Sequence, residues 1–361
     1  MADMLIVDAH QDIAWNMLTF DRDYTHSVDE TRRLEKGTQI SEFNGDTLLG
    51  WPEYQAGKVA LIFSTLFASP IRRQMGLWDT QCYVDSNQAR SMYLRQLQVY
   101  YDLIDKNPEK YRLVLTGGDL SQIIDHWQNE GNETHPVGLL ILMEGAEAIG
   151  DLSELEEWWD KGVRILGPAW AGNHFCGGTG EPGPLTTEGF ALLEKMADIG
   201  FTLDLSHMDE RAALQALDAF SGQIVATHAN ALAKLTGSQS NRHLSDRVIR
   251  GLIERDGMIG IVPFNNFLKV GWGRREDVPL MAVFQHMDHV CQLAGDARHV
   301  GLGTDFDGGF GLQSTPAEID AITDLQKIAP ILRQAGYPEE AVKSIFGDNW
   351  LNCVRKALPG R

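Results

Sequence analysis

Several apolar, strand-like runs in this chain end on a histidine or a carboxylate, and this pattern constrains the fold more than any other feature. The runs read LIVDAHQD, GLLILMEG, FTLDLSH, QIVATHAN and HVGLGTDFDG. A run of apolar residues that stops on a polar one places that side chain at the end of a strand. When many strands of one chain do so, we expect a barrel of parallel strands with its chemistry at their carboxyl ends.

Helix-like segments separate these runs, as expected for a parallel sheet built from βαβ units. For example, one pattern from Thr187 to Ile199 stops at Gly200, a residue typical of helix ends. We predict eight strands, at residues 5–10, 60–66, 138–143, 163–169, 201–206, 224–228, 258–263 and 299–304. The polar residues that end these runs come from separate strands, whereas an open doubly wound sheet would gather its ligand groups around one point where the strand order reverses. The pattern therefore favours an α/β fold of the (β/α)8 TIM-barrel type over an open doubly wound sheet.

Three segments interrupt or extend this alternation. Residues 20–58 are expected to form a loop and a short helix, and residues 70–135 contain a predicted long helix from Asp85 to Lys106. Residues 316–361 are expected to be helical. No linker, repeat or low-complexity segment divides the sequence, so residues 1–361 are predicted to form a single domain.

Composition limits the classes of binding partner and indicates the cellular compartment. A formal net charge of -19 argues against nucleic acid or an anionic membrane as a partner. The four cysteines are widely spaced and form no CxxC motif, which favours free thiols in a reducing compartment. We find no signal-peptide pattern and no apolar run near the ~20 residues of a membrane span, so the expected location is cytoplasmic. The sequence does not fix the oligomeric state, and a homodimer stays open.

The polar strand ends carry the residue types of a catalytic metal site. His10 and Asp12 lie two residues apart after the first strand, a spacing that points both side chains to one face. His207 and His228 are one helix-plus-strand step apart, so neighbouring strands would present them side by side. Glu144 has two carboxylate oxygens and can bridge two cations. Taken singly, each could instead be a hydrogen-bonded core residue, but the set favours zinc or a related divalent ion.

Two other positions have candidate roles. Asp305 is the first residue after the last predicted strand, so we favour it for chemistry, whereas Asp307 with Gly308 is typical of a turn. Arg242 precedes a predicted helix in the segment SNRHLSD. It is either an ordinary surface arginine or a bidentate clamp on a substrate carboxylate.

The ordered set of segments resembles the renal (membrane) dipeptidase family of zinc peptidases, in the metal-dependent amidohydrolase superfamily. The matching segments run from residue 7 to about residue 352, which is nearly the whole chain. They are VDAHQD, LMEGAEAIGD, GVRIL, FTLDLSHMDE, VATHANA, NRHLSD, GLGTDFDG and FGDNWL. The resemblance implies a hydrolase, specifically a metallopeptidase with two zinc ions per chain. Other divalent metals are alternatives, because the same ligands accept them.

The resemblance also implies a role for each candidate residue. His10 and Asp12 would bind one ion, His207 and His228 the second, and Glu144 both. Asp305 would handle the proton of the attacking water and of the leaving amine. Arg242 would hold the C-terminal carboxylate of a dipeptide. The expected chemistry is attack on the peptide bond by a zinc-activated hydroxide.

One position departs from the family pattern. After the fourth strand, family members carry a histidine in a Thr-His-Asn stretch that contacts the substrate near the scissile carbonyl, and the aligned residue here is Trp170. Tryptophan has a single donor and cannot become a cation. We hypothesise that Asn173 or His174 supplies the missing donor. The glycine-rich stretch GGTGEPGPL that follows is expected to form a mobile loop over the site.

Three functions stay open at this point. The first is a dipeptidase for dipeptides with a free C-terminal carboxylate, and the resemblance implies that a C-terminal D-residue is accepted. The second is another amidohydrolase activity at the same site, such as N-acyl amino acid deacylation or lactam hydrolysis, because a fold alone does not fix a function. The third is a non-catalytic binding protein, against which the complete ligand set and Asp305 argue.

Overall fold

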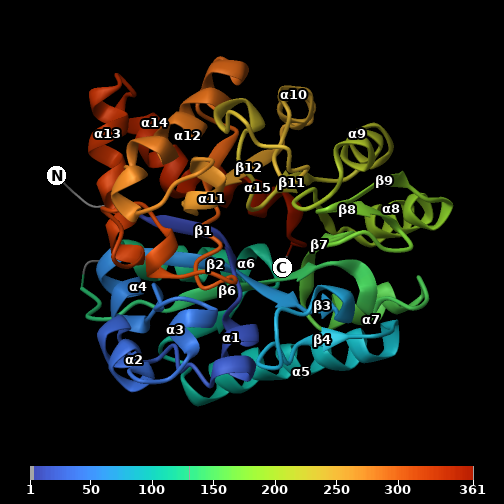
Figure 1. Cartoon of the computed structure of the whole chain (residues 1–361), viewed down its shortest axis with the longest axis horizontal. Coiled ribbons are helices and arrows are strands. Elements are labelled where there is room, and N and C mark those ends of the chain that lie inside the picture. The colour runs from blue at the N-terminus through green and yellow to red at the C-terminus, as the bar shows by residue number, and fades with distance from the viewer. Residues whose placement is uncertain (1–3, 130, 361) are drawn as a thin grey trace.

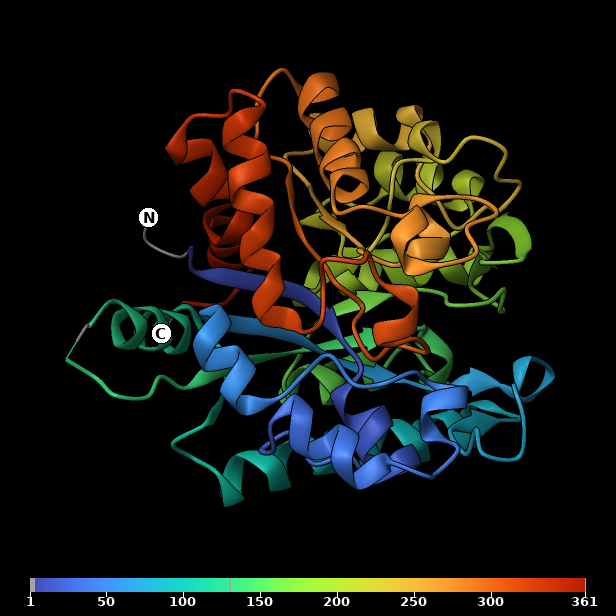
Figure 2. The ribbon, with the colours of Figure 1, turned by 60° about the vertical axis from the view of Figure 1, so that its left-hand side comes forward.

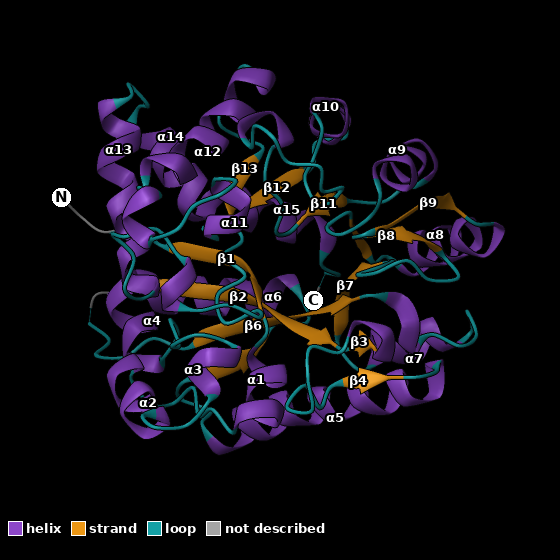
Figure 3. Ribbon diagram, viewed as in Figure 1, coloured by secondary structure: helices purple, strands orange, loops and turns teal. Residues whose placement is uncertain are grey.

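Eight parallel strands close into a barrel at the centre of the molecule, and helices surround it (Figure 1, Figure 3). The computed structural model describes residues 4–129 and 131–360. Around the barrel the strand order is β2-β1-β13-β12-β11-β10-β7-β6, and pairing of β6 with β2 closes the ring. The barrel strands are β1 (Ile6–Gln11), β2 (Val59–Phe67), β6 (Val137–Glu144), β7 (Val163–Gly167), β10 (Thr202–Asp204), β11 (Ile224–Ala226), β12 (Met258–Ile261) and β13 (Val300–Leu302). The predicted fold class and all eight predicted strands are confirmed, with every strand end within two residues of its prediction.

Five short strands lie outside the ring. They are β3 (Ser69–Pro70), β4 (Cys82–Tyr83), β5 (Tyr111–Leu113), β8 (Cys176–Gly178) and β9 (Glu181–Leu185). Strands β3 and β4 pair with each other, and β5 extends the sheet beside the start of β6. Strands β8 and β9 form an antiparallel hairpin in the glycine-rich stretch. The stretch that was expected to form a mobile loop over the site therefore contains a paired hairpin, and its mobility stays a prediction.

Helices fill the connections between barrel strands. They are α1 (Ile13–Phe20), α2 (Val28–Glu35), α3 (Ile40–Phe43), α4 (Trp51–Gly57), α5 (Ser86–Lys106), α6 (Gly117–Gln128), α7 (Glu154–Asp160), α8 (Thr187–Ile199), α9 (Glu210–Ala219), α10 (Asp246–Glu254), α11 (Asn265–Leu268), α12 (Met281–Ala294), α13 (Ile328–Gln334), α14 (Glu339–Lys343) and α15 (Asn349–Ala357). Short 3-10 segments are η1 (Ile71–Arg73), η2 (Ala146–Ala148), η3 (Leu232–Lys234), η4 (Arg275–Asp277), η5 (Leu312–Ser314) and η6 (Ile322–Lys327), and η7 (Ser344–Asp348) is a π-helix.

Capping residues explain why several helix limits could be predicted. The Asp85 side chain accepts a hydrogen bond from the backbone N–H of Gln88 at the start of α5. Helix α8 ends at Gly200, whose left-handed conformation suits glycine. Residues 20–58 contain three helices where one was expected, and regular helix in the C-terminal segment begins at Ile322.

The apolar core has one part inside the barrel and a larger part outside it. A smaller cluster brings together buried residues from five different barrel strands, which can meet only inside the ring: Val7, Phe63, Leu140, Val225 and Met258. Trp350 from α15 packs against Phe63, with ring centroids 5.2 Å apart, and belongs to the same cluster. The larger cluster lies between the outer faces of the strands and the helices. Burial on both faces is what a parallel sheet requires.

The layout delivers every strand end to one mouth of the barrel. Figure 2 shows the helices of the N-terminal third on one side of the central strands and the C-terminal helices on the other. Because all the ring strands are parallel, the residues that follow them gather at the same end. None of the helices formed by residues 4–129 and 131–360 combines the length and the apolar character needed to cross a bilayer.

Candidate metal centre and active site

Glu144, the last residue of β6, lies at the centre of a group of three imidazoles. Its Oε1 atom lies 3.0 Å from Nε2 of His207 and 3.3 Å from Nε2 of His228. Its Oε2 atom lies 3.4 Å from Nε2 of His10. The structure therefore brings together the predicted ligands from four strand ends around one carboxylate, which is only 6% exposed.

Backbone conformation aims several of these side chains. His207 and Asp305 have φ angles of 66° and 57°, in the left-handed region that residues other than glycine rarely adopt. Such conformations persist when the surrounding structure holds them, and they cluster at functional sites. The neighbouring strands also make room, because a β-carbon at Gly260 or Gly303 would overlap the carbonyl oxygen of Thr227. His228, the next residue, is thereby seated close to the barrel axis.

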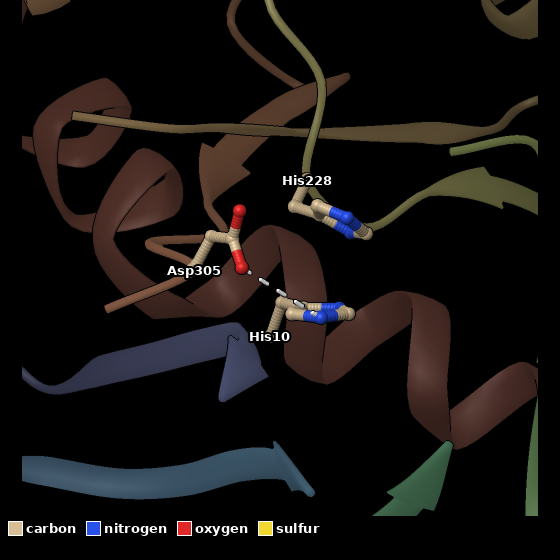
Figure 4. A group of neighbouring side chains, drawn as sticks. All are labelled: His10, His228 and Asp305. Atoms are coloured by element: carbon tan, nitrogen blue, oxygen red, sulfur yellow. Dashed lines mark ion pairs between the residues drawn. The ribbon is translucent and has the colours of Figure 1, made fainter. Parts of the chain in front are cut away.

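The ligand atoms form three overlapping groups in which all atoms lie within 4.8 Å of one another. The groups are His10, Asp12 and Glu144; Glu144, His207 and His228; and His10, His228 and Asp305. Figure 4 shows the third group, in which the Asp305 carboxylate points toward the His10 ring. Nε2 of His10 lies 3.7 Å from Oδ2 of Asp12 and 3.9 Å from Oδ1 of Asp305.

The donor set fits a divalent metal ion. Oδ1 of Asp12 is buried and has no hydrogen-bond partner in the described chain, although buried carboxylate oxygens are normally satisfied. Imidazole nitrogens and carboxylate oxygens are the ligands that zinc and related ions accept in catalytic sites. A cation placed among these atoms would satisfy Asp12 and separate the imidazoles that now crowd Glu144.

Burial sets the charge of the ligand imidazoles. Burial lowers the pKa of His207 to about 4, and the nearby Arg242 guanidinium lowers it further in the same sense. Burial likewise lowers the pKa of His228 well below its usual value. Both rings are therefore neutral near pH 7, as a metal ligand must be. Burial also lowers the pKa of His10, but the Glu144 and Asp12 carboxylates outweigh it and raise that pKa well above its usual value.

A second contact orients two of the imidazoles. Nδ1 of His228 lies 3.0 Å from Oγ1 of Thr227, and that hydroxyl donates to Oδ2 of Asp204 at 2.5 Å. Because the hydroxyl proton is given to Asp204, the ring must donate from Nδ1, which leaves the Nε2 lone pair facing Glu144. Nδ1 of His207 meets Oγ1 of Thr179 at the same 3.0 Å distance. Such outer partners fix the tautomer of metal ligands.

The site opens into a cavity of about 290 Å³. Asp12, Glu144, His207, Arg242 and Asp305 all line it. Burial raises the pKa of Asp305 well above its usual value, and the Asp12 and Glu144 carboxylates act in the same direction. Asp305 can therefore hold a proton near the ligand set, a property that general acid–base catalysis needs.

Arg242 is a buried cation with unused donors. It is 4% exposed, and its Nη2 donates to the carbonyl oxygen of His228 at 2.6 Å. Its Nε and Nη1 atoms have no hydrogen-bond partner in residues 4–129 and 131–360. The structure thus excludes the surface-arginine interpretation, because the guanidinium lies in the cavity wall with two donor atoms free.

The structure separates Trp170 from the two residues proposed to replace its donor. Trp170 lines the cavity, with its ring centroid 5.9 Å from that of His207. The Asn173 side chain donates to the carbonyl oxygen of Pro168 and to Oε1 of Glu147, so it shapes its own loop. The His174 side chain is exposed on the outer face, beside Glu188. Neither Asn173 nor His174 is among the described residues that line the cavity.

The stabilising role of Asp307 could not be predicted from the sequence. This residue does take a left-handed turn conformation, as expected, with a φ of 64°. It is also fully buried, and it accepts hydrogen bonds from Tyr24, Thr47 and the backbone of Leu48 beside an ion pair with Arg22. These partners lie some 260 residues earlier in the chain, so no local pattern could have revealed them.

Comparison with known proteins supports this description. A family model described as membrane dipeptidase (peptidase family M19) matches residues 1–358. The solved structure of dipeptidase AC, a metallopeptidase of family M19, is 25% identical, with a TM-score of 0.79 over 99% of each chain. A metallopeptidase from Rhodobacter sphaeroides, solved with a phosphinate mimic of the dipeptide L-Ala-D-Ala, is 24% identical, with a TM-score of 0.79 over 99% of this chain and 100% of that one. A protein from the pqqA 5′ region of Klebsiella pneumoniae is 29% identical over 72% of this chain and 94% of its own length.

Proposed function

The chain belongs to the membrane dipeptidase family of metallopeptidases, and on that premise we propose that it hydrolyses dipeptides with a free C-terminal carboxylate. The observation that carries this proposal is the position of Arg242, a buried cation that lines the same cavity as Glu144, His207 and Asp305 and has two nitrogen atoms without a partner in the described chain. A guanidinium with unpaired N–H groups in a buried wall is suited to bidentate recognition of a carboxylate. The dipeptide mimic bound by the Rhodobacter enzyme motivates including C-terminal D-residues in the substrate range.

We propose two divalent ions per chain, with zinc as the first choice. His10 and Asp12 would hold one ion, His207 and His228 the other, and Glu144 both, since it belongs to two of the ligand groups. When bound, such ions acidify a water molecule and polarise a carbonyl group. The neutral state of His207 and His228 supports this assignment.

The protein's own residues would then position the substrate and move a proton. The Arg242 guanidinium would donate to the C-terminal carboxylate and so position the peptide bond near Glu144. Asp305 would accept the proton of the attacking water and return it to the leaving amine. Its raised pKa, caused mainly by burial, supports a carboxyl that exchanges a proton within the catalytic cycle.

The test is a metal count on the purified protein together with a hydrolysis screen, with and without a chelator. We expect close to two metal ions per chain and chelator-sensitive cleavage of dipeptides. The panel includes N-acyl amino acids and lactams. If these are cleaved and dipeptides are not, the second amidohydrolase function replaces the first.

A variant separates catalysis from metal binding. Asp305→Asn should retain the metal and lose turnover, because the amide cannot take up the proton. Asp198→Asn is a matched control, since it removes the same charge from an exposed position on α8. Full activity in Asp305→Asn would refute the proposed role of Asp305. The cytoplasmic location and the homodimer stay predictions.

A further inference from the structure

Asp79 is a buried carboxylate in the cavity wall that lacks a cationic partner. It lies in the connection between β3 and β4, is 2% exposed and lines the same cavity as Arg242. Its Oδ2 atom accepts one long hydrogen bond, 3.3 Å, from the backbone N–H of Met75. The Cys82 thiol is another polar neighbour, and burial raises its pKa to about 11, so it stays neutral. No Lys, Arg or His nitrogen of the described chain lies within the 4.0 Å of an ion pair with Asp79.

The other basic side chain in the described cavity lining, besides Arg242 and the imidazole of His207, is already engaged elsewhere. Arg73 also lines the cavity, but its Nε donates to Oε1 of Glu181 at 3.0 Å. Buried charges in proteins are normally paired. The environment of Asp79 therefore leaves room for a cation that the chain itself does not supply.

Asp79 and Arg242 belong to connections that leave opposite sides of the barrel. Asp79 follows β2, Arg242 follows β11, and these two strands are four steps apart in the closed ring of eight. Figure 1 shows β11 above β7 and the pair β3 and β4 below it. Glu144 and His207 line the same cavity, and Asp79 is the one carboxylate among its described lining residues that belongs to none of the ligand groups. A substrate held by its carboxylate at Arg242, with its peptide bond near Glu144, would direct its other end away from Arg242, where Asp79 is available to meet it.

We propose that Asp79 receives the N-terminal ammonium group of the substrate. The cavity would then be built for a zwitterion, with a fixed cation for the carboxylate at one end and a fixed anion for the ammonium at the other. This inference rests on the proposed dipeptidase function and sharpens it, because N-acyl amino acids carry no ammonium group.

Apolar side chains surround the proposed ammonium site. Phe67 ends β2 and packs against Trp170, with ring centroids 5.2 Å apart, and Met75 lines the same part of the cavity. These side chains favour an apolar side chain on the N-terminal residue of the substrate. The substrate class is therefore a free dipeptide whose N-terminal residue has an apolar side chain.

The test compares the activity of two proteins on two substrates. Wild type and Asp79→Asn are assayed on a dipeptide with an apolar N-terminal residue and on its desamino analogue, in which hydrogen replaces the amine. The asparagine keeps an acceptor for the Met75 N–H and removes only the charge. We expect wild type to favour the free dipeptide by roughly 10- to 100-fold in kcat/KM, the scale of a hydrogen bond to a charged group. Asp79→Asn should lose most of that preference through a raised KM for the free dipeptide alone.

Several outcomes decide the matter. If Asp79→Asn keeps the wild-type preference, the ammonium is recognised elsewhere and the proposal is overturned. The same holds if wild type shows no preference. Asp198→Asn, which removes an exposed charge, should behave as wild type on both substrates. If Asp79→Asn does not fold, the inhibition constants of the two compounds against wild type still test the proposal, because equal constants contradict it. Wild type that cleaves no dipeptide at all refutes the proposed function instead.

Discussion

The threonine behind His228 gives the sharpest test of how the metal centre is held. Thr227→Val keeps the shape of the side chain and removes the hydroxyl, so it deletes the contacts to Nδ1 of His228 and to Oδ2 of Asp204. The ring is then free to take the other tautomer or to rotate. We expect the effect to appear in metal affinity, since Nε2 is the atom that faces Glu144.

The expected loss of metal affinity can be estimated from the burial of the residues around the hydroxyl. Loss of an outer partner of a metal-bound histidine typically costs 10- to 100-fold in metal affinity, or about 1.4–2.8 kcal/mol. Thr227, His228 and Asp204 are all buried, so water cannot replace the hydroxyl, and we expect Thr227→Val near the upper end. Thr179 is only half-buried, so Thr179→Val should stay near tenfold.

The assay is competition for zinc between the protein and a chromogenic chelator, which requires no substrate. Thr187→Val, at an exposed position on α8, serves as the control and should bind zinc as wild type does. Circular dichroism checks that each variant is folded. If Thr227→Val binds zinc within about twofold of wild type, the hydroxyl does not set the tautomer of His228 and the argument fails.

Three further predictions concern charge. Arg242→Gln should lower kcat/KM for dipeptides about 100-fold, because a carboxylate held by two charge-assisted hydrogen bonds loses both, while the metal content stays constant. Asp307→Asn should lower the free energy of unfolding by about 3 kcal/mol in urea titrations, because it removes one of the two carboxylates that pair with the buried Arg22 and weakens the buried hydrogen bonds from Tyr24 and Thr47. Glu339→Gln, which breaks an exposed ion pair, should cost less than about 1 kcal/mol. Burial raises the pKa of Glu147 to about 7, so the folded state binds this proton more tightly and stability falls as pH rises from about 4.5 to 7. Between pH 5 and pH 8 the free energy of unfolding of wild type should fall by about 2.5 kcal/mol relative to Glu147→Gln, which cannot titrate there.

The barrel could be predicted because its evidence is local. Each strand is a short apolar run, and each ends on a polar residue that the parallel arrangement carries to one mouth. Helix limits followed from caps such as Asp85 and Gly200, which act within four residues. The ligand set could be assembled for the same reason, since strand ends of one barrel must face one another.

The positions of Asn173 and His174 could not be predicted in the same way. The expectation that either could reach the cavity depended on sequence distance from Trp170. The hairpin of β8 and β9 instead turns the loop so that Asn173 bonds to Pro168 and His174 faces solvent. Residues only a few positions apart can lie on opposite sides of a loop. Which side each side chain occupies depends on the pairing of the hairpin more than on the residue type.

The contacts that tune the site were hidden for a different reason, which is their range along the chain. Thr179 meets His207 across 28 residues, and Asp204 meets Thr227 across 23. Both threonines are ordinary residues in the sequence, and they gain their role only because β10, β11 and the β8–β9 hairpin lie side by side. A candidate metal ligand can thus be proposed from its residue type and strand position. Its tautomer and orientation are fixed by partners from other elements and become visible only when the chain is folded.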